Sequence, residues 1–179
     1  QRALKRGATL KKILAMIAGL RRTSGIPIVL FGYYNPILHY GPERFAEDAA
    51  GLDFITLIAP TTDPKRARKI LRRATGFVYY ISVTGVTGTA VPRPDDVRRD
   101  VKRLKEMTAL PVAVGFGIST PAQAATIAPL TDGVVVGSAL VRLIGNNGGS
   151  GNLIQSAASF AAEIRQSIDD ACPPDFPVE

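Results

Sequence analysis

The chain has 179 residues, of which 46% are apolar and 21% are charged. This length fits one domain, and this composition is typical of a folded globular protein, which excludes a disordered or fibrous chain. No run approaches the 18 consecutive apolar residues of a membrane-spanning helix. Cys172 is the single cysteine and no secretory signal is apparent, so we expect no internal disulfide and a cytoplasmic setting.

The net charge is +7, from 22 Lys and Arg against 15 Asp and Glu. Much of the surplus lies in two stretches, residues 65–73 and 93–105, which both fit amphipathic helices with basic outer faces. No aromatic residue interrupts either stretch, so neither offers the stacking surface that single-stranded nucleic acid requires. We therefore expect solvated helix surfaces and no nucleic-acid or membrane partner.

Helices and short apolar strands alternate along the chain. Helical spacing predicts a first helix over residues 10–20, capped by Thr9. Apolar runs predict five strands of a parallel sheet, at residues 27–31, 54–58, 77–81, 111–114 and 133–136. Further helices are predicted to begin at Pro42, at Pro64 after the cap Asp63, near Asp95 as a cap, at Pro121 after Thr120, at Ala139 and over residues 153–168. Residues 82–93 and 145–152 are predicted loops.

This alternation predicts an α/β protein with a parallel sheet. A closed (β/α)8 barrel needs about 250 residues, so 179 residues supply only five or six of its units. Two interpretations remain open, namely an open sheet and a barrel that lacks some of its units.

Glycine-rich segments follow three of the predicted strands, at residues 85–88, 115–117 and 137–138. In parallel α/β folds the functional groups gather at the carboxyl ends of the strands. Glycine lets backbone N–H groups approach an anion, and a helix N-terminus adds partial positive charge. The combination predicts a phosphate-binding site at these strand ends.

Other candidate residues are weaker. His39 is the single histidine and has no other metal-ligating residue type near it in sequence, so we expect an exposed loop residue and no metal site. Cys172 lies in a proline-rich tail without features of a nucleophile. Tyr79 and Tyr80 are consecutive on a predicted strand, so one should face inward and the other should face the helices.

At these strand ends the sequence resembles the tryptophan synthase alpha subunit family. The resemblance follows the family's order and separations from about residue 1 to residue 168. It rests most specifically on two strings, Ser-Val-Thr-Gly-Val-Thr-Gly at residues 82–88 and Gly-Phe-Gly-Ile-Ser at residues 115–119, and is extended by residues 27–36, 57–62 and 137–139.

The resemblance implies a carbon–carbon lyase of tryptophan biosynthesis that cleaves indole-3-glycerol phosphate to indole and glyceraldehyde 3-phosphate. It implies Gly88, Phe116, Gly117, Gly137 and Ser138 as ligands of the substrate phosphate. Thr87 would belong to a loop that closes over the site, and Tyr79 would be the inward tyrosine near the catalytic carboxylates. No cofactor is implied in this chain, because pyridoxal phosphate belongs to the beta subunit of the α2β2 tetramer, which residues 32–35 would help to contact.

Two departures from the family pattern bear on activity. The two strand units that carry the family's catalytic Glu and Asp have no counterpart before Gln1, and a strand–helix unit is expected between Ala50 and Gly51 but is missing. We therefore expect an incomplete TIM-type barrel with about five of eight strands over residues 1–168, an irregular tail over 169–179, and no catalytic acid or base in the chain. The alternatives are a non-catalytic phosphate-binding partial barrel or deletion variant, and another phosphate-binding barrel enzyme. Unpaired sheet edges also predict self-association.

Overall fold

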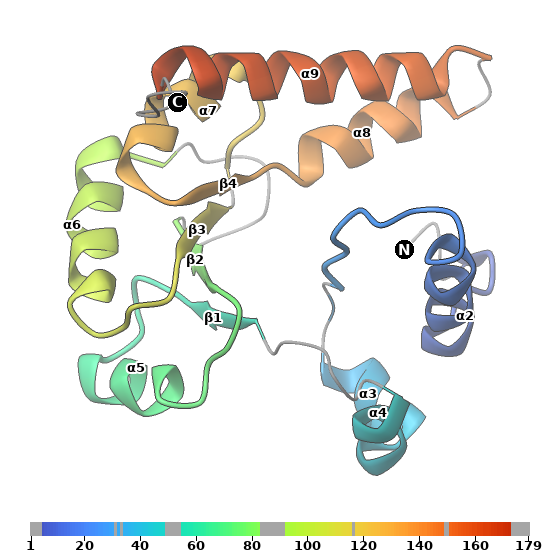
Figure 1. Cartoon of the computed structure of the whole chain (residues 1–179), viewed down its shortest axis with the longest axis horizontal. Coiled ribbons are helices and arrows are strands. Elements are labelled where there is room, and N and C mark those ends of the chain that lie inside the picture. The colour runs from blue at the N-terminus through green and yellow to red at the C-terminus, as the bar shows by residue number, and fades with distance from the viewer. Residues whose placement is uncertain are drawn as a thin grey trace, which may run out of the picture. The chain divides into compact units, whose positions relative to one another are not determined.

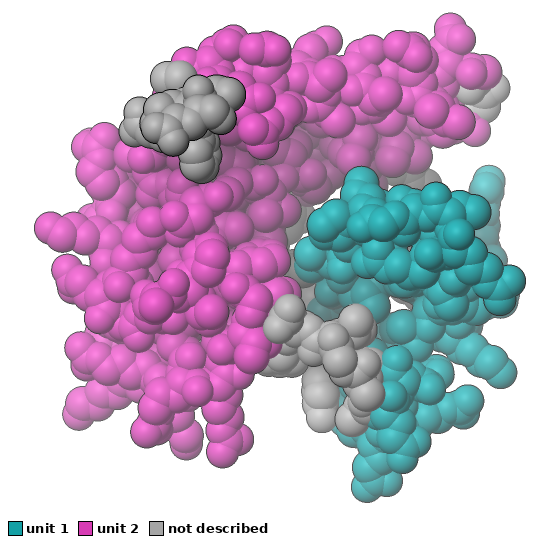
Figure 2. Space-filling model, viewed as in Figure 1, with its two compact units in different colours: residues 1–52 teal, residues 53–179 magenta. Residues whose placement is uncertain are grey.

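The computed structural model describes residues 5–30, 32, 34–48, 55–82, 92–115, 117–148 and 151–172. The chain divides into two compact units, Gln1–Leu52 and Asp53–Glu179 (Figures 1 and 2). The predicted loop residues 83–91 and the predicted tail from residue 173 onward lie outside the described residues. The division into a barrel domain over 1–168 and a tail stays a prediction.

The described residues of the first unit include the helices α2 (Leu10–Leu20), α3 (Tyr34–Tyr40) and α4 (Pro42–Asp48). The predicted cap of α2 is confirmed, because Thr9 Oγ1 accepts a hydrogen bond from the Lys12 backbone N–H at 3.3 Å. The predicted start of α4 after Gly41 is also confirmed, and the φ of +95° at Gly41 favours glycine there. No residue of α2 is buried.

The strand predicted at residues 27–31 is wrong for its described part, since residues 27–30 form no regular structure. A strand persists only where neighbouring backbone groups accept and donate its hydrogen bonds, and the described part of this unit contains no strand that could do so. Helix α3 was not predicted. It contacts α4 through the Tyr40 hydroxyl, which donates to Asp48 Oδ2 at 2.6 Å, and Arg44 lies 5.1 Å from the Tyr40 ring centroid.

The second unit is built on a four-stranded parallel sheet, which confirms the other four predicted strands. The strands are β1 (Thr56–Ile58), β2 (Val78–Ile81), β3 (Val112–Gly115) and β4 (Gly133–Val135), in the spatial order β1-β2-β3-β4. Tyr79 lies opposite Leu57 on one side and Ala113 on the other. Consecutive parallel neighbours joined by helices are the arrangement found in a sector of a (β/α) barrel.

The helices of this unit are α5 (Pro64–Leu71), α6 (Pro94–Lys105), α7 (Pro121–Ile127), the 3-10 helix η1 (Ala128–Leu130), α8 (Ser138–Asn147) and α9 (Leu153–Ala171) (Figure 1). Alternate strand residues pack against α5, α6, α7 and α9 to form the core. Its fully buried members include Ile58, Val78, Tyr80, Val97, Leu104, Val112, Val114 and Ile127.

The helix starts agree with the predicted caps at two places and differ at a third. Asp63 Oδ1 accepts the N–H groups of Lys65 and Arg66 at 2.9 and 3.1 Å, and Thr120 Oγ1 accepts that of Gln123 at 3.3 Å. Asp95 is not a cap. The N-cap of α6 is Arg93, and Asp95 lies in the first turn, where its charge complements the helix dipole.

The last two helices are longer than predicted. Helix α8 continues to Asn147, through the first three residues of the loop predicted at 145–152, and α9 ends at Ala171 rather than at residue 168. Along α9, Ile164 is buried, but Ala161 is exposed and Ile154 is 84% exposed. Ile154 lies in the first turn, where α9 and α8 extend beyond the sheet and no core is available to it (Figure 1).

Candidate functional site

The carboxyl ends of β2, β3 and β4 lie side by side and carry the predicted site glycines. Ser82, directly after β2, donates from both its backbone N–H and its hydroxyl to the Gly115 carbonyl, at 3.1 and 2.7 Å. Gly115 in turn is paired with Val135 of β4. Gly117 and Gly137 follow these paired residues by two positions each, so the structure brings the two glycines to neighbouring strand ends.

The turn after β3 requires its second glycine. Gly117 has a φ of +81°, a conformation that side chains with a Cβ rarely adopt. Ile118 is buried, and the Ser119 N–H and hydroxyl both donate to Gln123 Oε1, at 2.8 and 3.1 Å. The Gln123 side chain therefore stabilises the loop before α7.

Helix α8 begins at Ser138 with its N-terminus accessible. Its N-cap, Gly137, makes no side-chain capping hydrogen bond, the first turn holds no acidic residue, and both Gly137 and Ser138 are exposed. A Cβ at Gly137 would meet nothing within 4 Å. The first N–H groups of a helix lack intrahelical acceptors and carry partial positive charge, so this end of α8 has the chemistry of an anion site.

The remaining residues of the predicted site are outside the described residues. Gly88 and Phe116, expected as phosphate ligands, and Thr87, expected in the closing loop, all belong to this group. Their roles stay predictions.

Tyr79 and Tyr80 face opposite sides of the sheet, as predicted from strand geometry. The Tyr79 ring lies over Gly115, so close that a Cβ built on Gly115 would be 2.0 Å from the Tyr79 hydroxyl oxygen. Burial raises the pKa of Tyr79, so its hydroxyl stays protonated well above neutral pH. Gly115 is therefore the residue that makes room for this tyrosine on the face away from the helices.

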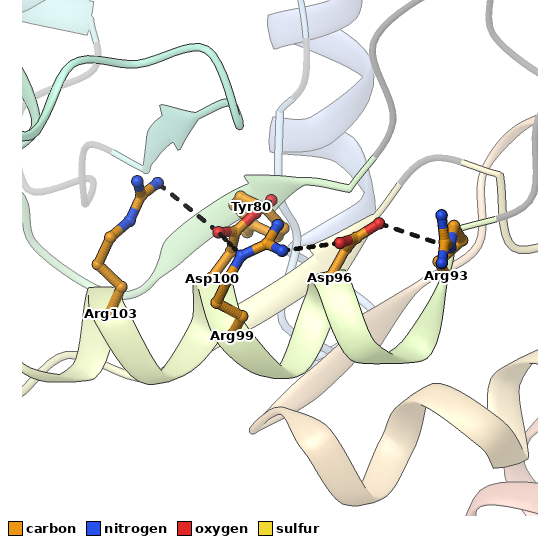
Figure 3. A network of polar contacts seen from close by, with 6 residues as sticks. All are labelled: Tyr80, Arg93, Asp96, Arg99, Asp100 and Arg103. Carbon is orange, nitrogen blue, oxygen red and sulfur yellow. Dashed lines mark hydrogen bonds and ion pairs between the residues drawn. The ribbon is translucent and has the colours of Figure 1, made fainter.

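Tyr80 points toward the helices and meets a buried carboxylate that the sequence analysis missed. Its hydroxyl donates to Asp100 Oδ2 at 2.5 Å, and Arg99 and Arg103 lie 3.4 and 4.0 Å from Asp100 Oδ1 (Figure 3). Burial and the Asp100 hydrogen bond raise the pKa of Tyr80. In the helical pattern, Asp100 falls on the same face as the apolar residues Val97, Val101 and Leu104. A charged residue on an apolar face was the signal in the sequence that could have indicated a buried carboxylate.

The described carboxylates near the sheet have structural partners. Asp132, ahead of β4, accepts the Val112 N–H at 2.8 Å and the Lys105 ammonium at 2.7 Å. Burial acts to raise the pKa of Asp132, but these two hydrogen bonds and the Lys105 charge outweigh it and leave the pKa below its ordinary value. Asp132 lies at the amino ends of β3 and β4, opposite the glycine-rich rim.

The minor candidates have no catalytic arrangement around them. His39 is exposed but belongs to α3 rather than to a loop, and its Nδ1 lies 2.9 Å from the Asn35 carbonyl oxygen. Cys172 is a half-buried free thiol. Within the described ranges, no group of three metal-ligating side chains occurs, and no helix there is long and apolar enough to span a membrane.

A parallel sheet with its helices on one face and its glycines at one rim defines an α/β protein of the barrel type. The family model of the tryptophan synthase alpha chain matches residues 1–50 and 47–169. The chain belongs to the tryptophan synthase alpha chain family.

Individual relatives agree with this assignment. The tryptophan synthase alpha chain of Geobacter sulfurreducens is 44% identical, with 94% of this chain and 74% of the relative covered. That of Geotalea uraniireducens is 41% identical, with coverage of 94% and 73%. Among solved structures, tryptophan synthase subunit alpha from Legionella pneumophila is 30% identical with a TM-score of 0.81, and the match covers 94% of this chain and 73% of that one.

The comparisons are also consistent with the expected internal gap. The Geobacter alignment runs over 195 positions, whereas 94% of 179 residues is about 168, so roughly 27 positions of the alignment (195 minus 168) have no residue of this chain. The family model matches in two separate segments that overlap at residues 47–50, beside the boundary between the two compact units at Leu52 and Asp53.

Proposed function

We propose that this chain binds indole-3-glycerol phosphate, the ester that a tryptophan synthase alpha subunit cleaves to indole and glyceraldehyde 3-phosphate. The uncapped N-terminus of α8 at Ser138, beside the strand end that carries Gly117, is the observation that carries the proposal. Gly117, Gly137 and Ser138, together with Gly88 and Phe116, bind the phosphate. Tyr79 lies on the sheet face where the indole ring is expected, and Thr87 belongs to the closing loop.

The phosphate site can be tested with a single charge. Ser138→Asp places a carboxylate in the first turn of α8, where it complements the helix dipole but repels a bound phosphate. We expect glycerol 3-phosphate, measured by calorimetry or NMR titration, to bind the unmodified chain and to lose at least 10-fold in affinity with Ser138→Asp, at unchanged or higher thermal stability.

Thr9→Asp is the matched control, because it adds the same charge at the N-terminus of α2. It should leave glycerol 3-phosphate binding unchanged. Equal binding by the unmodified chain and by Ser138→Asp would remove the α8 N-terminus from the site.

We also propose that the 179 residues by themselves do not turn the substrate over. The retro-aldol reaction needs a proton delivered to an indole ring carbon and a proton removed from the side-chain hydroxyl, which positioned carboxyl groups accomplish. Three of the described carboxylates lie next to the strands, and each has a structural partner. Asp63 caps α5, Asp100 accepts the Tyr80 hydroxyl, and Asp132 accepts the Val112 N–H. Loss of a positioned acid or base typically lowers a rate by about 10²–10⁴.

An assay of indole release from indole-3-glycerol phosphate tests this second proposal. We expect phosphate binding without indole formation, so the chain would act as a non-catalytic phosphate-binding partial barrel. Indole formation at the rate of a complete alpha subunit would contradict inactivity while leaving the phosphate site intact.

Family membership supports a beta-subunit partner in an α2β2 tetramer, with pyridoxal phosphate bound in the beta subunit and a cytoplasmic setting. Residues 32–35 are the proposed contact, and of these Gly32 and Asn35 are exposed. Co-sedimentation with the beta subunit of a relative is the expected result, and an Asn35→Arg variant should weaken it.

A further inference from the structure

The net positive charge of the protein is concentrated on one helix. Residues 65–73, which form α5 and the turn that ends it, contain six cations and no acidic residue, whereas the net charge of the whole chain is +7. All six side chains are exposed: Lys65, Arg66, Arg68, Lys69, Arg72 and Arg73. At 100° per residue, the four cations within α5 span an arc of about 160°, opposite the buried residues Ala67 and Leu71.

The second basic stretch, on α6, differs in its partners. Its arginines are paired, with Arg98 on Asp95 at 3.6 Å, Arg99 on Asp96 at 2.9 Å and Arg103 on Asp100 at 4.0 Å, and Lys105 pairs with Asp132. No cation of residues 65–73 forms an ion pair within the described parts of the chain. From the sequence the two stretches look equivalent, and we expected no nucleic-acid partner for either because neither offers a stacking surface for single strands. The unpaired cations of residues 65–73 revise that expectation for this stretch, since binding to a phosphate backbone needs no stacking.

Helix stability does not account for this arrangement. Cations stabilise the last turn of a helix, where Arg68 and Lys69 lie, but they are unfavourable in the first turn. Lys65 and Arg66 occupy the first turn, and six neighbouring like charges repel one another. The basic face of α5 therefore carries an electrostatic cost that an anionic ligand would relieve.

Four of the cations, Arg66, Lys69, Arg72 and Arg73, line an open surface hollow with Ile70. The guanidinium groups can each bind a phosphate through two parallel hydrogen bonds. Among the described residues that line the hollow, Ile70 is the only apolar one and none is aromatic. The buried core of a protein interface is apolar and rich in aromatic residues, so the hollow does not fit a protein partner.

We propose that this basic face, Lys65 to Arg73 on α5 and its final turn, binds the phosphate backbone of nucleic acid without reading its sequence. This basic face is independent of the proposed substrate site, which lies at the carboxyl ends of β2, β3 and β4. The recognised chemistry is a chain of phosphate groups, which duplex nucleic acid and inorganic polyphosphate share.

Fluorescence anisotropy with a labelled 20-base-pair DNA duplex tests the proposal on the full chain. Contact with about four phosphates predicts a slope of about −3.6 for log affinity against log salt, so affinity should fall about 100-fold between 50 and 200 mM salt. Two duplexes of unrelated sequence should bind equally. Unlabelled polyphosphate should compete, and poly-glutamate of equal charge should compete far less.

A matched pair of variants locates the site. One replaces Arg66, Lys69, Arg72 and Arg73 by Gln, and the control replaces four exposed cations elsewhere by Gln, namely Lys11, Arg22, Lys102 and Arg142. Both lower the net charge by four, so a response to net charge alone would be equal. We expect at least a 30-fold loss of affinity for the first and less than a threefold loss for the control, with circular dichroism confirming that both fold.

Three outcomes would overturn the proposal. They are no binding by the unmodified chain at 50 mM salt, equal losses in the two variants, and competition by poly-glutamate as strong as that by polyphosphate. The salt slope of the unmodified chain tests the proposal even if the first variant does not fold.

Discussion

The identity of single residues on the two sheet faces follows from what each side chain meets. Tyr79 requires a neighbour without a Cβ, and Gly115 supplies it, whereas Tyr80 requires a polar partner in the core, and Asp100 supplies it. The alternation of a strand was enough to predict that the two tyrosines face opposite sides. Neither partner could be predicted, because Gly115 and Asp100 come from other elements brought there by folding.

Gly115→Ala should destabilise the protein by about 1–3 kcal/mol, because the new methyl group would occupy the space of the Tyr79 ring. Combining it with Tyr79→Leu should cost less than the sum of the two single changes. Urea unfolding of the four chains gives the coupling free energy.

Gly137→Ala is the control for that cycle, since its added methyl group meets nothing within 4 Å and should change stability by no more than about 0.5 kcal/mol. An equal effect of the two alanine substitutions would show that Tyr79 moves aside freely.

At the scale of elements, prediction succeeded where local pattern and tertiary environment agree. Helices α5 and α6 and strands β2 and β3 have buried stripes or runs that match their position on the core. Residues 27–30 are as apolar as these strands, yet they form no strand because pairing partners are not encoded locally. The ends of α8 and α9 were missed for a related reason. Gly145 is locally unfavourable in a helix, but α8 continues through it to Asn147 because α8 packs against α9, a contact that the local sequence does not encode.

Asp132 links three elements, and its lowered pKa predicts an acid dependence. The pKa of Asp132 is lower in the folded protein than in the unfolded chain, where it is near 4. Its carboxylate therefore adds to the free energy of unfolding above about pH 4, and this contribution is lost as the pH falls through the pKa of the folded state. Urea midpoints measured from pH 5 to pH 2 should therefore fall less steeply in Asp132→Asn than in the unmodified chain.

Lys105→Gln removes the cation that helps to hold this pKa low and should give an intermediate slope. An unaltered acid slope in Asp132→Asn would mean that other carboxylates account for the acid sensitivity.

At the scale of the whole molecule, 179 residues supply only five or six of a barrel's eight units, so the sequence alone predicts an incomplete barrel. The roughly 27 unmatched positions, and the match of the family model in two segments that meet beside the unit boundary, agree with an incomplete barrel. The site was predictable to the level of strand ends and glycines. The accessible N-terminus of α8 was not predictable. Whether a side chain caps that helix depends on which hydrogen-bond acceptors the fold brings near it, and the sequence alone does not show this.

In the described sheet β1 is an edge strand, and edge strands can pair with another chain. We expect the chain to self-associate at micromolar concentrations in sedimentation velocity. Inserting the unmatched positions of the Geobacter sulfurreducens relative at the expected gap between Ala50 and Gly51 should reduce association, and a scrambled segment of equal length should not. A stable monomer of the unmodified chain would contradict this expectation.

The anchoring of Asp132 at the rim opposite the glycines has a consequence for redesign. Asp132 joins α6, β3 and β4 through hydrogen bonds at the amino ends of the strands, on the side of the sheet away from the glycine-rich rim. Replacing the loops at the glycine-rich rim, or grafting catalytic carboxylates onto them, would leave the hydrogen bonds of Asp132 intact. New catalytic groups could therefore be introduced at that rim without loss of the contacts that stabilise the opposite end of the sheet.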